Sequence, residues 1–196
     1  MLARLDEDQA RLSITEAQLT RVLKAISEIP QPAARASALL TLANNTGFTD
    51  HKMALKFLNQ ASEIVKTLDP GREQDEAQVR LAFLYCLEKS DRGMAIMESL
   101  VPKLNELVAA AIKLDGYETQ YVREGEWNMS AEGSLGSLLT LLATASGYFA
   151  WYDFDRAVSL AGQFERNEIR MMAQLKLAQS IPSGPPKRPQ LGYAQW

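Results

Sequence analysis

A nine-residue pattern that occurs near both ends of the chain most constrains what this sequence can fold into. Residues 35–43 read RASALLTLA and residues 170–178 read RMMAQLKLA, so both follow Arg-x-x-Ala-x-Leu-x-Leu-Ala. A weaker third copy, QDEAQVRLA, occupies residues 74–82. Recurrence of one helical face at intervals of a few tens of residues is typical of repeat architectures. The sequence therefore predicts stacked helical hairpins, and in the last helix the expected apolar face is Ile169, Ala173 and Leu177.

Length and composition agree with a helical chain. The 196 residues suffice for one ordinary domain or for about four helical hairpins. The apolar 46% is dominated by Ala, Leu and Met rather than by Val, Ile and Thr, which favours helix over sheet. We therefore expect an all-α fold.

Apolar spacing, capping residues and prolines divide the chain into about eight helices. We expect a kink or a break at Pro102, because proline lacks the amide hydrogen that a helix interior requires. Residues 1–14 are expected to be flexible or to extend the first helix, residues 15–181 to form the helical domain, and residues 182–196 to form a Pro-rich extended tail. The expected helices are 15–29, 32–46, 50–68, 73–89, 92–114, 131–152, 154–164 and 169–181, with an irregular loop at 115–130.

The order of small and large residues resembles a degenerate tetratricopeptide-type repeat. After the first copy of the pattern comes a short turn with Asp50, and then Ala54, Leu58 and Ala61. Residues 153–164, DFDRAVSLAGQF, have Asp155, Ala157, Leu160 and Ala161 in comparable places. The resemblance implies a right-handed α-solenoid of antiparallel hairpins whose surface binds a peptide, a helix or another subunit. A compact helical bundle is the alternative, since its Ala and Leu stripes have a similar period.

Charge and cysteine content exclude several kinds of site. Net charge is −3 and the 21 basic residues are spread along the chain, which argues against a nucleic-acid surface. A single cysteine, Cys86, and a single histidine, His51, cannot form a disulfide within the chain or a Cys/His zinc site. We expect Cys86 to be a buried, inert thiol and His51 to be exposed at a helix start. No metal or other cofactor is expected.

The N-terminus lacks the pattern of a secretory signal. Asp6, Glu7 and Asp8 stand where an apolar segment is required. We therefore expect a soluble cytoplasmic protein, unless an upstream leader has been removed.

An uncharged run at residues 133–152, GSLGSLLTLLATASGYFAWY, is long enough to span a bilayer. Eight of its twenty residues are Gly, Ser or Thr, and Glu132 and Asp153 flank it in place of Lys or Arg. A helix buried by its neighbours explains the run without lipid. Membrane association remains an alternative, and membrane spanning is not expected.

Catalysis is not expected, because the sequence has no phosphate-binding Gly loop, no G-x-S-x-G and no His/Cys dyad. The loop at 115–130 provides the alternative, a small-ligand or hydrolytic site. Its carboxylates are Asp115, Glu118, Glu124 and Glu126, beside Tyr117 and Trp127.

The expected function is that of a non-catalytic interaction or assembly subunit with a protein or peptide partner, and a homo-oligomer is possible. Exposed Tyr and Trp are common anchors of interfaces. The candidate partner-binding residues are Tyr117, Tyr121, Trp127, Tyr193 and Trp196. For the three residues of the loop, the alternative is that the loop folds back and buries its aromatic rings.

Overall fold

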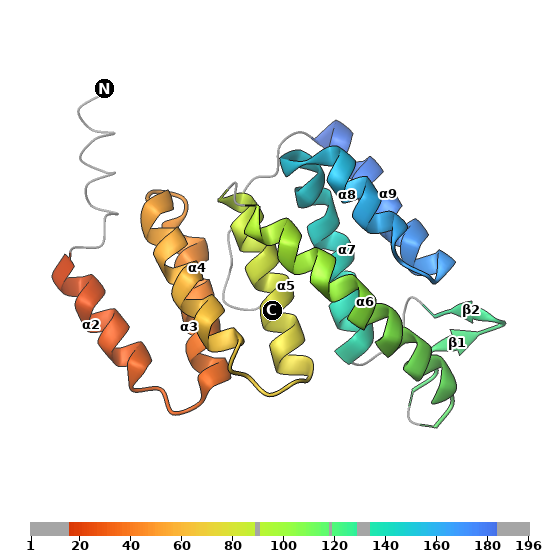
Figure 1. Ribbon diagram of the computed structural model, residues 1–196, viewed down its shortest axis with the longest axis horizontal. Helices are drawn as coiled ribbons and strands as arrows, with labels where there is room; N and C mark the ends of the chain where they lie inside the picture. The colour runs from red at the N-terminus through yellow and green to blue at the C-terminus, as the bar shows by residue number, and fades with distance from the viewer. Residues whose placement is uncertain (1–15, 89–90, 118, 129–133, 184–196) are drawn as a thin grey trace. The chain divides into compact units, whose positions relative to one another are not determined.

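The computed structural model describes residues 16–88, 91–117, 119–128 and 134–183 (Figure 1). Within these ranges it has eight helices and one two-stranded β-ribbon, so the expected all-α fold is confirmed. The helices are α2 (Glu16–Ser27), α3 (Pro32–Thr46), α4 (His51–Val65), α5 (Arg72–Leu87), α6 (Arg92–Lys113), α7 (Ser134–Tyr152), α8 (Phe154–Gly162) and α9 (Asn167–Ser183). The chain divides into two compact units, one ending at Ala77 and the other beginning at Gln78.

The first unit is built on the hairpin of α3 and α4. Pro32 occupies the first turn of α3, where its missing amide hydrogen costs nothing. Asp50 caps α4, because its carboxylate accepts a hydrogen bond from the Met53 amide at 2.9 Å. The two helices pack along each other, and α2 contacts α3. Their core contains Leu39, Leu40, Ala43, Ala54, Phe57, Leu58 and Ala61.

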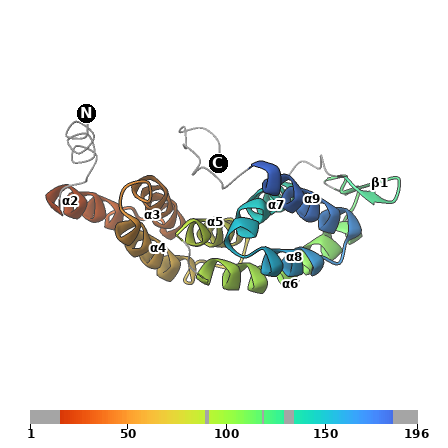
Figure 2. The ribbon, with the colours of Figure 1, turned by 90° about the horizontal axis from the view of Figure 1, so that it is seen from above.

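The second unit is centred on α7, which packs against α6, α8 and α9 (Figures 1 and 2). Gly147 of α7 permits a close approach to α9, since a Cβ there would lie 3.3 Å from the Lys176 carbonyl oxygen. The buried residues of α7 explain why this segment lacks charge: they are Leu138, Leu139, Leu142, Ala143, Ala145, Ser146 and Phe149.

Two local features refine the sequence analysis. Of the kink or break expected at Pro102, the break does not occur, because α6 continues from Arg92 to Lys113. Apolar residues on both sides of Pro102 share one buried face, and their burial offsets the lost hydrogen bond; they are Met94, Met97, Leu100, Val101, Leu104 and Val108. The loop is not irregular throughout, since Val122–Arg123 (β1) and Glu126–Trp127 (β2) pair in antiparallel register.

The buried positions of α3 recur in α5 and α7. In α3 they include Ala36, Leu40, Ala43 and Thr46, at spacings of four, three and three residues. In α5 the four residues aligned by the pattern are buried, and in α7, which contains no copy of the pattern, four buried residues have the same spacing. They are Asp75, Val79, Ala82 and Tyr85 in α5, and Leu139, Ala143, Ser146 and Phe149 in α7.

The helices that follow also share a pattern. Each has a small buried residue near its start: Ala54 in α4, Gly93 in α6 and Ala157 in α8. Asp153 caps α8 as Asp50 caps α4, accepting a hydrogen bond from the Arg156 amide at 3.1 Å. The small residue lets two helices approach closely. At Gly93 an added Cβ would lie 2.5 Å from the Ala82 carbonyl oxygen and against Cys86 Sγ.

The last copy of the nine-residue pattern is used differently. In α9 the buried residues are Ile169, Ala173 and Leu177. At a rotation of 100° per residue, this face is nearly opposite to the buried face of α3. The face that the apolar spacing predicts for the last helix, Ile169, Ala173 and Leu177, is therefore the buried one.

Candidate interaction surface

The outward side of α9 carries several exposed apolar residues. Met171, Leu175 and Ile181 are 59%, 57% and 57% exposed, and Ala178 between them is exposed too. We call these four residues the α9 stripe. Their spacing of four, three and three residues places them on one side of the helix. None of the four residues is charged, and they extend over about three turns, with exposed Gln174 on the same side of the helix.

Polar contacts hold α9 in place from both ends. At its start, Asn105 of α6 clamps the turn between α8 and α9: its amide group donates to the Gln163 carbonyl at 2.9 Å and accepts from the Glu165 amide at 3.2 Å. At its end, Trp151 of α7 donates from Nε1 to the Ser180 carbonyl at 3.1 Å. The stripe therefore lies on a fixed helix.

The β-ribbon contacts the start of α9. Its two-residue turn has Glu124 at φ 54° and Gly125 at φ 87°, the positive values that a tight hairpin requires. Asp115 orders the approach to the turn, because one carboxylate oxygen accepts from the amides of Tyr121 and Val122 at 2.5 and 2.8 Å. Asp115 therefore has a structural partner in the backbone.

Arg166 and Glu168 attach the ribbon to α9. The Glu168 carboxylate accepts from the Trp127 amide at 2.7 Å and pairs with Arg166 at 2.9 Å. Arg166 also donates to the Gly125 carbonyl at 2.8 Å. Burial of Glu168 favours its neutral form, but the Trp127 amide and Arg166 outweigh this and lower the pKa of the carboxyl. Glu168 is thus held as an ionised acceptor.

The structure separates the three candidate aromatic residues of the loop. Trp127 is buried, and its ring stacks on half-buried Tyr121 at 5.6 Å between centroids. Tyr117 is 84% exposed. Tyr121 and Trp127 thus form a small cluster over the start of α9, and Tyr117 alone presents its ring to solvent. Tyr193, Trp196 and Glu118 lie outside the described residues.

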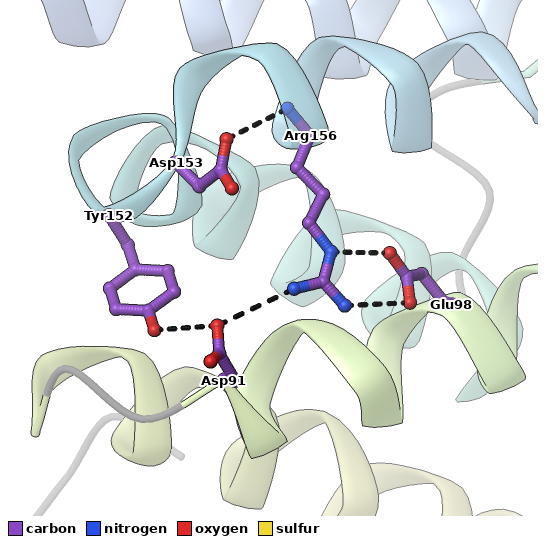
Figure 3. A network of polar contacts seen from close by, with 5 residues as sticks. All are labelled: Asp91, Glu98, Tyr152, Asp153 and Arg156. Atoms are coloured by element: carbon purple, nitrogen blue, oxygen red, sulfur yellow. Dashed lines mark hydrogen bonds and ion pairs between the residues drawn. The ribbon is translucent and has the colours of Figure 1, made fainter.

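A second polar cluster joins α6 to the turn between α7 and α8 (Figure 3). Arg156 Nε and Nη2 donate to the two carboxylate oxygens of Glu98 at 2.6 and 2.9 Å. Arg156 Nη1 also lies 3.6 Å from Asp91, which accepts a hydrogen bond from the Tyr152 hydroxyl at 2.8 Å. This bidentate arrangement fixes the start of α8 on α6.

The titration of these groups follows from their partners. Hydrogen bonds from Arg156 lower the pKa of Glu98, although partial burial acts in the opposite direction. The hydrogen bond to Asp91 raises the pKa of Tyr152. Glu98 is therefore held as an ionised acceptor that fixes the start of α8 on α6.

Cys86, near the end of α5, is buried as expected and faces Gly93 at the start of α6. Burial raises the pKa of its thiol to about 12, with smaller and opposed effects from Arg156 and Asp91. His51 is exposed at the start of α4, which was also expected. Among residues 16–88, 91–117, 119–128 and 134–183, no group of three His, Cys, Asp or Glu is placed to hold a metal ion.

In the described part of the chain, every helix is too short or too polar to cross a membrane, α7 included. Comparisons of the chain with protein-family models, with curated proteins and with solved structures find no match in any of the three. The sequence predicts the packed face of α9, Ile169, Ala173 and Leu177, but it did not single out the apolar residues on the opposite side of the helix. The signal that could have found it is that α9 has apolar residues on two opposite sides.

Proposed function

We propose that this protein is a non-catalytic, tetratricopeptide-like repeat subunit that binds another protein through the α9 stripe. The observation that carries the proposal is the exposure of Met171, Leu175 and Ile181 on one side of a fixed helix. Contiguous exposed apolar surface is uncommon on monomeric proteins and marks interaction sites.

The burial register favours a repeat array over a bundle. Three helices bury the same four positions, and the helices that follow them each begin with a small buried residue. A bundle has no reason to repeat these positions, whereas stacking of similar hairpins produces them. Repeat proteins act by presenting extended surfaces, which is the role proposed here.

Tyr117 is a second candidate contact, because its ring is exposed while Tyr121 and Trp127 pack on the start of α9. In this proposal, Trp127 supports the surface indirectly by fixing the β-ribbon. Its replacement is expected to loosen the ribbon rather than remove a contact with a partner.

Affinity purification of the tagged full-length protein from its native cells tests the proposal. We expect a stoichiometric partner with the unaltered chain and at least a tenfold lower recovery with Met171→Glu/Leu175→Glu, because charge on the stripe opposes apolar burial. Leu114→Glu is the matched control, since Leu114 is an apolar residue 60% exposed at the end of α6. Equal recovery with both variants, or no partner at all, contradicts the proposal.

A further inference from the structure

We draw no further inference here: the strongest candidate, the exposed apolar side of α9 formed by Met171, Leu175, Ala178 and Ile181, carries none because nothing in the structure shows what covers it.

Discussion

Helices α3 and α9 contain the same nine-residue pattern but bury opposite sides. In α3, Leu40 at the sixth position of the pattern is buried, whereas in α9 the equivalent Leu175 is exposed. In α9, Ala173 at the fourth position is fully buried, whereas the equivalent Ala38 of α3 is only half-buried.

The difference shows that the pattern provides two apolar sides, and that the neighbouring helices decide which is used. α3 packs along α4, the helix that follows it, whereas α9 packs on α7 and α8, which precede it. A helix with apolar residues on two opposite sides is suited to a position between neighbours. In α9 one of these sides is uncovered, which is why we regard it as a binding surface.

The same substitution at the two equivalent leucines tests whether one is buried and the other exposed, and it has the largest expected effect. Leu40→Glu places a charge in the core of the first unit and is expected to cost at least about 3 kcal/mol. Leu175→Glu is expected to change the free energy of unfolding by no more than about 0.5 kcal/mol. Denaturation followed by circular dichroism, with hydrogen exchange to locate the affected helices, measures both. Similar destabilisation by the two variants would show that the stripe is covered.

A second pair of variants, one in α6 and one in α8, tests whether Gly93 is a position of close helix contact. Gly93→Ala is expected to destabilise the second unit by about 1–3 kcal/mol, because the new Cβ meets the backbone at Ala82. Gly162→Ala in α8 meets nothing within 4 Å and is expected to be neutral or to stabilise by up to about 1 kcal/mol. Alkylation of Cys86 at pH 8 reports whether the close contact between Gly93 and α5 is lost. We expect alkylation to be slow in the unaltered protein and faster in Gly93→Ala. If both alanine variants behave alike, Gly93 is not a close-contact position.

Removal of Arg156 tests how α8 is held against α6. Arg156→Ala is expected to cost about 1 kcal/mol, a modest amount because both members of the pair with Glu98 are partly exposed. Arg156→Lys should recover little of this, since Lys cannot make the bidentate contact. Urea denaturation provides the measurement, and complete rescue by Lys would contradict the geometry in Figure 3.

The smallest expected effect is a dependence of stability on acid. The pKa values of Glu98 and Glu168 are lowered in the folded protein, so both carboxylates stabilise it above the pKa of an unfolded glutamate, near 4.3. This contribution is lost as the pH falls through the lower folded values. Glu168→Gln should reduce the loss between pH 5 and pH 3, and hydrogen exchange should locate the change at the β-ribbon. Glu63→Gln, at the exposed ion pair with Lys66 in α4, is the control and should leave hydrogen exchange at the β-ribbon unchanged.

The helices could be predicted from sequence because their signals are local. Asp50, Pro32 and the apolar spacing of α4 each act within one or two turns, and the structure places helix boundaries close to where these residues require them. The small buried residues near the starts of α4 and α8, Ala54 and Ala157, were recognised for the same reason, whereas Gly93 of α6 was not.

The proposed binding surface could not be predicted from sequence, because its exposure depends on which helices pack against α9. The spacing of four residues predicts that Leu177 packs with Ile169 and Ala173, but it does not state whether Leu175, on the opposite side of the helix, is covered by another element. The β-ribbon that contains buried Trp127 is held by Glu168, which accepts from the Trp127 amide, and by Arg166, which donates to the Gly125 carbonyl, and both lie 41 residues further along the chain. Such contacts cannot be identified by local periodicity.

The measurement that tests the account most directly is the accessibility of a cysteine placed on the stripe. Buried Cys86, with a pKa raised to about 12, gives little background, so Leu175→Cys and Leu40→Cys can be compared in the full-length chain with a maleimide at pH 7. We predict that Leu175→Cys in the isolated protein reacts with the maleimide as fast as an unfolded control. It should become protected when the partner is bound. Protection of Leu175→Cys in the isolated protein, to the degree seen for Leu40→Cys, would contradict the claim that α9 presents an uncovered surface.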